Sequence, residues 1–183
     1  MGQSFSALSP ELVRFIARQK IFFVATATAA GRVNVSPKGL DSLRILGDSR
    51  VVWLNLTGST NETSAHVQVD PRMTLMFCAF EGPPLILRLY GQAKVVHRAD
   101  PEWSGLISRF PPHPGPRQIF DLGLDLVRTS CGEGVPLLDY AQDRDALVHW
   151  AAAKGEEGIR RYWAEKNAVS LDGLPTRIVA KGG

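Results

Sequence analysis

Apolar positions at helical spacing open the chain. Ser9 can cap a helix with Pro10 at its first position, and the helix is expected to end near Lys20. Its buried face would consist of Leu12, Phe15 and Ile16. The pattern therefore predicts a short amphipathic helix that packs on whatever follows it.

Runs of β-branched and aromatic residues then replace the helical spacing. They predict short strands over 21–27, 33–36, 42–46 and 51–56, with turns at Ala30-Gly31 and Gly47-Asp48. After a polar stretch and a helix that ends near Val69, further strands are expected over 73–80 and 85–97, the latter as one strand or as two broken at Gly91. Six or seven antiparallel strands are the number typical of a small barrel.

Helices dominate the remainder of the chain. Asp100 is expected to cap a helix whose core-facing stripe is Trp103, Leu106, Ile107 and Phe110. One more strand, over 119–127 with a possible bulge at Gly123, precedes two helices over about 144–154 and 157–166, which end at Gly155 and Asn167. The class is therefore α+β, as a single domain over 1–183 with a core barrel at about 12–130 and a C-terminal helical extension at about 140–183.

Composition narrows the class of partner. The net charge is only +3, and the 21 basic residues are spread along the chain, which argues against nucleic acid. No apolar stretch is long enough to span a membrane, and two cysteines give no disulfide framework, so we expect a soluble cytoplasmic protein. The start, Met1 to Ser6, fits a myristoylation pattern that we attribute to chance.

The segment from Gly58 to Thr63 carries the most informative chemistry. Its hydroxyl and amide side chains, together with free backbone N–H groups at a helix start, could bind a phosphate. Taken alone, the segment fits an ordinary capped helix start better. Lys38 is placed just past the end of a strand. Arg88 lies inside an apolar strand, where an arginine must be paired, exposed on the outer face of the barrel or bound to an anion.

Familiar catalytic motifs are missing from the sequence. There is no G-x-G-x-x-G, Walker A or G-x-S-x-G sequence, and the four histidines lack metal-ligand spacing, so we expect no metal site. Cys131, in the loop over 128–136, could be an activated thiolate, but a small residue in a tight glycine-rich loop is the simpler interpretation. No catalytic residue is assigned.

Three motifs follow one another along the chain: Ser36-Pro37-Lys38-Gly39, then Val52-Trp53-Leu54-Asn55 leading into Gly58 to His66, and then Asp70 to Phe77. In these motifs the chain resembles the FMN-binding split-barrel proteins related to pyridoxamine 5′-phosphate oxidase. The C-terminal half, with Thr129-Ser130-Cys131-Gly132 and Asp172-Gly173-Leu174-Pro175, resembles an uncharacterised branch in which Arg128 stands where glutamine is expected. The Trp/Arg-rich C-terminal segment of true pyridoxamine phosphate oxidases is missing, so vitamin B6 oxidation is not assigned.

The resemblance implies a six-stranded Greek-key split barrel with peripheral helices, paired as a homodimer with FMN at the subunit interface. In such a site Lys38, Ser59, Asn61 and Thr63 would hold the phosphate and ribityl chain. The isoalloxazine edge would meet the backbone around Ser36 and the Leu54-Asn55 strand end, with Arg88 near the phosphate or the pyrimidine.

Several functions stay open at this level. The leading one is an FMN-dependent oxidoreductase acting on an unknown small molecule, in which the flavin performs hydride or electron transfer. An F420-dependent reductase on the same fold is an alternative, as is a flavin-binding or storage protein that does not turn over. A haem-handling protein and a purely structural module are weaker hypotheses.

Overall fold

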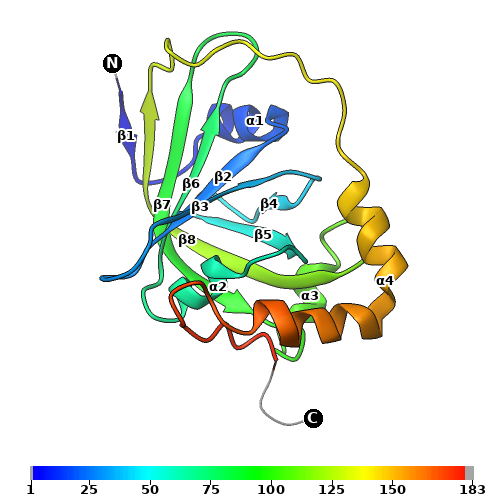
Figure 1. Cartoon of the computed structure of the whole chain (residues 1–183). Helices are drawn as coiled ribbons and strands as arrows, with labels where there is room; N and C mark the ends of the chain where they lie inside the picture. The colour runs from blue at the N-terminus through cyan, green and yellow to red at the C-terminus, as the bar shows by residue number, and fades with distance from the viewer. Residues whose placement is uncertain (1, 180–183) are drawn as a thin grey trace.

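Residues 2–179 of the computed structural model are described, and they form one strongly curved antiparallel sheet with helices at its two ends (Figure 1). The strand order is β3-β2-β6-β7-β8-β5-β4, and β1 pairs with β8 outside this path. The strands are β1 (Ser4–Phe5), β2 (Phe22–Thr26), β3 (Asn34–Lys38), β4 (Leu43–Ile45), β5 (Arg50–Leu56), β6 (Arg72–Cys78), β7 (Ile86–Val96) and β8 (Pro116–Ser130). The helices are α1 (Pro10–Arg18), α2 (Glu62–Val67), α3 (Trp103–Ile107) and α4 (Ala146–Tyr162), followed by a π-helical turn, η1 (Trp163–Asn167).

Aromatic side chains bring the two ends of the sheet together. The Phe22 ring on β2 meets the Trp53 ring on β5 edge to face, with centroids 6.3 Å apart, and Trp53 stacks on Phe120 of β8 at 4.4 Å. These rings belong to the main core cluster, whose members from β2, β5, β6, β7 and β8 are almost all inaccessible to solvent. Because β3 and β4, the end strands of the path, do not pair with each other, the sheet is an open half-barrel.

The two longest strands, β7 and β8, cross most closely at a pair of glycines. A Cβ placed on Gly91 would lie 1.9 Å from the Gly123 carbonyl oxygen, so only glycine fits at this crossing. The register shifts here, because Tyr90 faces Leu126 while Gly91 faces Leu124. The extra residue on β8 is Asp125, two positions after the Gly123 that the sequence suggested as a bulge.

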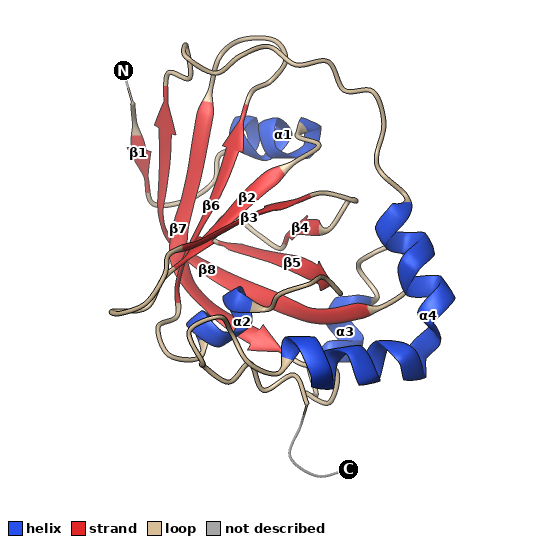
Figure 2. Ribbon diagram, in the orientation of Figure 1, coloured by secondary structure: helices blue, strands red, loops and turns tan. Residues whose placement is uncertain are grey.

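Helices cover three regions of the barrel (Figure 2). α1 lies at one end with Leu12, Phe15 and Ile16 buried in the core, and its start is capped by Ser9 Oγ, which accepts from the Leu12 N–H. The α3 stripe packs on the outward face of β5, β7 and β8, where Leu106 and Phe110 are buried. α4 and the C-terminal segment lie at the opposite end from α1, where Ile159 and Trp163 are buried.

The antiparallel, strand-dominated half-barrel with helices is confirmed, and several details of the prediction are corrected. The described sheet has eight strands where six were implied, because two short strands, β1 and β4, add to six longer ones. Lys38 is the last residue of β3 and does not follow it. α3 begins at Trp103 without a side-chain cap, because the Asp100 carboxylate accepts from the His97 N–H instead.

The C-terminal helices are joined more closely than expected. α4 runs through Gly155, whose φ of 63° breaks the helical geometry at the position where the sequence places a helix end. At the N-terminus, Gly2 to Phe5 lie along β8, and Met1, the first residue of the myristoylation-like pattern, lies outside the described residues.

Candidate functional site

The inward-facing side of β3 is polar, although it faces the barrel interior. Asn34, Ser36 and Lys38 pair in register with three residues of β2 that are 3%, 0% and 5% exposed, namely Thr26, Val24 and Phe22. Because side chains alternate along a strand, these three polar residues point to the same side as the buried ones. β3 therefore presents a polar row into the gap between the two ends of the open barrel.

Lys38 ends this row without an acidic partner. Its ammonium lies 5.4 Å from the centroid of the Trp53 ring, and within residues 2–179 it makes no ion pair or hydrogen bond. Burial, together with a smaller effect of the positive charge of Arg117, lowers the pKa of Lys38 to about 8. The site thus holds a partly buried cation that no described acidic group compensates.

Two more polar atoms beside Lys38 lack partners. Ser36 Oγ and Trp53 Nε1 are both buried, and neither has a hydrogen-bond partner among the described residues. Buried polar groups of a folded protein are nearly always satisfied, by protein, water or ligand. With the Lys38 ammonium, these atoms supply an unused set of hydrogen-bonding groups at the opening of the barrel.

The loop from Thr57 to Asn61 is covered by the chain's own C-terminal segment. Asn167 Nδ2 donates to the carbonyls of Gly58 (3.1 Å) and Ser59 (3.4 Å), and Trp163 Nε1 donates to Thr57 Oγ1 (2.9 Å). Asn61 Nδ2 in turn donates to the Asn167 carbonyl, and Asn61 is 2% exposed. The segment predicted as an open phosphate loop is therefore closed by residues about 100 positions later in the chain.

The helix that follows this loop is anchored in the same way. Thr63 is buried and accepts from Asn34 Nδ2 (3.1 Å), while Ser64 Oγ donates to the Thr176 carbonyl (2.8 Å). Of the three loop residues predicted to hold a phosphate, only Ser59 is exposed, whereas Asn61 and Thr63 are committed to internal contacts.

Arg117 was not singled out by the sequence and lies at the centre of this closed region. One guanidinium nitrogen donates to the carbonyls of Gly58 (3.4 Å) and Thr60 (2.8 Å) and to Asn167 Oδ1 (2.8 Å). Burial lowers the pKa of Arg117 to about 9, and its Nε has no partner among the described residues. Arg117 and Asn167 together fix the shape of the loop, and only the tertiary structure reveals this role.

The remaining predicted residues are dispersed. Leu54 is buried under α3, and its backbone N–H donates to the Ser42 carbonyl, while Asn55 Nδ2 donates to Gln118 Oε1 (3.3 Å). Arg88 alternates with the buried Leu87 and Leu89 and so faces outward, where it donates to Ser130 Oγ (3.0 Å). Arg88 and Lys38 therefore lie on opposite faces of the sheet, and the convergence of both on one ligand expected from the sequence does not occur within this chain.

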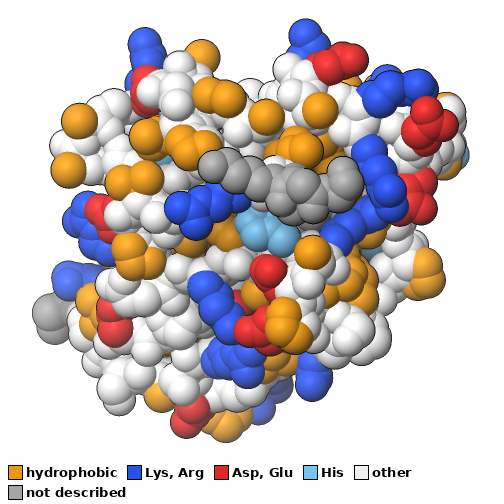
Figure 3. Space-filling model, turned by 90° about the horizontal axis from the view of Figure 1, so that it is seen from below, with side chains coloured by type: hydrophobic (Ala, Val, Ile, Leu, Met, Phe, Trp, Pro, Cys, Tyr) orange, Lys and Arg blue, Asp and Glu red, His pale blue; other side chains and the backbone are white. Residues whose placement is uncertain are grey.

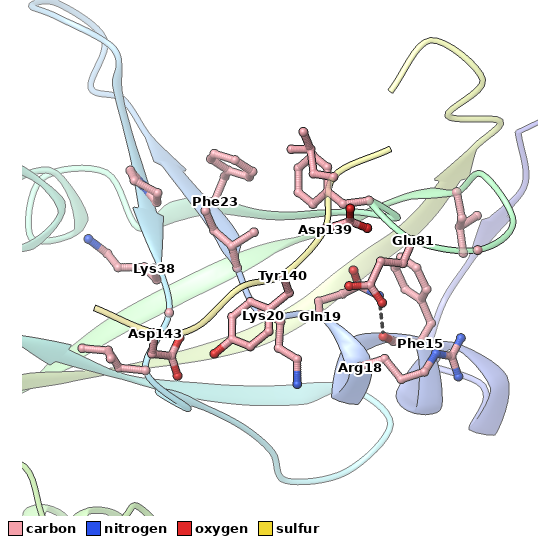
Figure 4. A pocket seen from close by; sticks show the side chains of 18 of the residues that line it. Phe15, Arg18, Gln19, Lys20, Phe23, Lys38, Glu81, Asp139, Tyr140 and Asp143 are labelled. Carbon is pink, nitrogen blue, oxygen red and sulfur yellow. Dashed lines mark hydrogen bonds between the residues drawn. The ribbon is translucent and has the colours of Figure 1, made fainter. Parts of the chain in front are cut away.

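A large pocket adjoins Lys38 on the side of α1 (Figure 4). It has a volume of about 1360 Å³ and is walled by α1, by the start of β2, by the end of β3, by the turn at 80–85 and by the segment at 138–147. Phe23 and Tyr140 project into it, and Lys38 lines it at the end of β3 with its ammonium directed away toward the Trp53 ring. This pocket could not be predicted from the sequence, because its walls are far apart along the chain.

Other candidate chemistry stays isolated. Cys131 is exposed at the end of β8, and Cys78 is buried, with burial raising the pKa of its thiol. No cluster of three or more potential metal ligands occurs among residues 2–179, and no helix in that range is long and apolar enough to cross a membrane. On the face seen in Figure 3, basic side chains alternate with acidic and apolar ones and form no continuous stripe.

Comparison with known proteins identifies the family to which the chain belongs. Residues 8–131 match the family described as pyridoxamine 5′-phosphate oxidase. A pyridoxamine 5′-phosphate oxidase family protein of Aspergillus flavus, ustO, is 35% identical over 191 residues, covering 93% of this chain and 76% of the relative. The chain therefore belongs to the pyridoxamine 5′-phosphate oxidase family.

Solved structures agree with the fold. A candidate pyridoxamine 5′-phosphate oxidase from Lactobacillus delbrueckii superposes with a TM-score of 0.55 at 21% identity, covering 67% of this chain and 94% of that one. A variant of HupZ from Group A Streptococcus gives a TM-score of 0.52 at 20% identity, covering 67% and 98%. Both likenesses are of fold alone, and each covers about two thirds of this chain.

Proposed function

We propose that this protein binds FMN in the gap of the open barrel and uses it as an oxidoreductase on a small molecule. One observation carries the proposal. The Lys38 ammonium, Ser36 Oγ and Trp53 Nε1 lie partly or fully buried at the barrel opening without partners in the described chain. Membership of the family supports the choice of a phosphorylated flavin as the ligand that satisfies them.

The physical argument begins with the charge. An unpaired buried ammonium is costly, and its cost is offset when an anion binds beside it. Arg117 adds a second positive charge that lowers the pKa of Lys38, so the local potential favours a phosphate. We assign the anionic end of FMN to Lys38, with Ser36 and the exposed Ser59 as further polar contacts.

The other predicted residues take supporting roles in this proposal. Asn61 and Thr63 maintain the loop through Asn167 and Asn34, and Leu54 and Asn55 extend the strand that carries Trp53. Arg88 would act only from the outward face of the sheet. FMN supplies hydride or electron transfer when bound, while the protein binds it, orients it and limits access of water.

The first experiment is the visible absorption spectrum of the purified protein, with mass spectrometry of any molecule that heat releases. We expect FMN. Release of F420 or of haem would mean that the protein uses a different cofactor and catalyses a different class of reaction. A colourless protein that binds none of the three when they are added would contradict the proposal.

Turnover is tested separately from binding. The FMN-loaded protein is mixed with NADH or NADPH without oxygen, and the flavin absorbance is followed before and after an electron acceptor is added. Reduction followed by reoxidation is expected for an oxidoreductase. A flavin that stays oxidised with both donors, and is unaffected by acceptors, would favour the storage function.

We also propose that two copies of the chain pair to complete the site. β3 is an end strand of the sheet, and its outward side exposes Val35 (61%), close to Val33 (71%) just before the strand. An uncovered apolar strand edge is usually protected by a partner. Sedimentation should give twice the monomer mass, and Val35→Lys should shift the species toward the monomer.

The pH dependence follows from Lys38. Its ammonium is protonated below a pKa of about 8, so FMN affinity should be highest below pH 8 and should fall as the pH rises through that value.

The stability of the protein without FMN should also depend on pH. The pKa of Lys38 in the folded protein lies below the value of 10.5 for the unfolded chain, so between about pH 8 and 10.5 the unfolded chain binds more protons. The free energy of unfolding should therefore rise with pH across that window, and chemical denaturation at several pH values, with Lys38→Met as the control that lacks this rise, measures it.

A further inference from the structure

The pocket beside Lys38 has features that the cofactor site does not require. Its volume of about 1360 Å³ exceeds the several hundred cubic ångströms that usually hold one small ligand. Four aromatic side chains line it, Phe15, Phe23, Phe80 and Tyr140, from α1, β2, the turn after β6 and the segment before α4. The pocket could therefore contain a bulky molecule in addition to the edge of a cofactor.

Charge around the pocket is balanced. Four acidic and four basic residues contribute to its lining, and one of the basic ones is Lys38 itself. Lys20 lies 5.2 Å from the centroid of the Tyr140 ring, so this second ammonium is already engaged with an aromatic face. A small anionic substrate would find no excess of cations in this lining, whereas an uncharged molecule meets a predominantly apolar wall.

One wall is a long irregular segment with few attachments. Figure 1 shows the chain running from the end of β8 around the side of the barrel to α4 without regular structure. At the pocket it is held by the Leu138 N–H, which donates to the Phe80 carbonyl (3.0 Å), and by the contact of Lys20 with Tyr140. Leu138 and Tyr140 are 54% and 43% exposed, so this wall keeps apolar surface open to solvent.

The pocket is continuous with the proposed cofactor site. Pro37 and Lys38 line it, and the Lys38 ammonium lies over Trp53 in the barrel opening. Figure 4 shows Lys38 and Phe23 on one side of the cavity and Tyr140 between them and the end of α1. Lys38 therefore belongs both to the wall of the pocket and to the proposed cofactor site.

We propose that this pocket is the substrate site and that it takes a bulky, uncharged, ring-containing molecule. The proposal rests on the proposed function, since the flavin at Lys38 would be the group that reacts with this substrate. It places substrate specificity in the apolar residues of α1, β2 and the segment at 138–147, and excludes small phosphorylated pyridines as the preferred class.

The test uses Nile red, an uncharged polycyclic dye, as the probe. Added to the full-length protein as purified, the dye should bind saturably at one molecule per chain, with a rise in its fluorescence. Leu138→Arg should weaken binding by about tenfold or more, because a charge on the pocket wall must lose its hydration when the dye binds. Leu137→Arg is the matched control, since Leu137 is the adjacent exposed leucine and does not line the pocket.

Three results would overturn the inference. One is equal loss of binding in both variants, and another is unchanged binding in Leu138→Arg. The third is a wild-type protein that binds no dye while Leu138→Arg changes its sedimentation from dimer to monomer, which would make a second copy the occupant. FMN content, measured on the same samples, separates this proposal from the cofactor proposal. A chain that binds dye in the pocket but lacks FMN would refute only the flavin function.

Discussion

Lys38→Met is expected to abolish retention of FMN through purification and to weaken its binding roughly 100-fold, because a charge-assisted contact to the phosphate is lost. The protein without FMN should be at least as stable as the wild type, since methionine removes a partly buried ammonium that no described acidic group compensates. Titration of the two proteins with FMN, followed by flavin fluorescence, and thermal unfolding without FMN would measure both effects.

Lys20→Met provides the control for this variant. Lys20 also lines the pocket, but its ammonium lies over the Tyr140 ring at the α1 end, away from Trp53. The Lys20→Met variant should therefore bind FMN with an affinity close to that of the wild type. If Lys38→Met bound FMN normally, or if both variants lost the same affinity, Lys38 would not be the phosphate ligand.

Asn167→Leu is expected to lower the free energy of unfolding by about 3 kcal/mol, because several buried groups lose their partners together. The carbonyls of Gly58 and Ser59 would lose a donor, and Arg117 would lose its only side-chain acceptor in the described chain. Leucine also cannot accept from the guanidinium in place of the amide. Chemical denaturation would measure the loss, and hydrogen exchange should increase first at residues 58–61.

Lys166→Leu is the matched comparison for Asn167→Leu. Lys166 is the preceding residue in η1 and is exposed, so its replacement should change the free energy of unfolding by no more than about 0.5 kcal/mol. An equal effect of the two substitutions would mean that the π-helical turn, and not the Asn167 contacts, stabilises the C-terminal segment. FMN affinity should fall in Asn167→Leu alone, because Ser59 belongs to the loop that Asn167 holds.

The elements of the barrel could be predicted because their signals are local. Ser9 and Pro10 fix the start of α1, and the alternation along 85–97 predicts β7 with Leu87 and Leu89 inward. Asp100 was wrongly expected to cap α3, because its carboxylate is used by the His97 N–H. Whether a carboxylate caps a helix depends on which nearby backbone N–H points toward it. The sequence alone does not show this orientation.

The site could be predicted only in part, for a different reason. Lys38 was identified as an unexplained cation just past the end of a strand, and the structure makes it the last residue of β3, with its ammonium over the Trp53 ring. The expectation that Lys38 and Arg88 contact the same ligand was wrong, because the alternation of side chains along β7 directs Arg88 to the outer face of the sheet. Gly58 to Thr63 has the composition of an open anion loop, yet contacts from Asn167 and Thr176 bury most of it.

The sequence by itself determined the α+β class and the order of the strands along the chain, because periodicity and turn residues act over a few positions, and the family was indicated by the resemblance of its motifs. It also determined which residues carry unusual chemistry, such as Lys38 in its short polar motif. The tertiary structure alone decided which of these residues meet. The closed loop under Asn167, the role of Arg117 and the pocket beside Lys38 each join segments that are tens of residues apart, and such contacts depend on how the sheet curves and where the C-terminal segment packs.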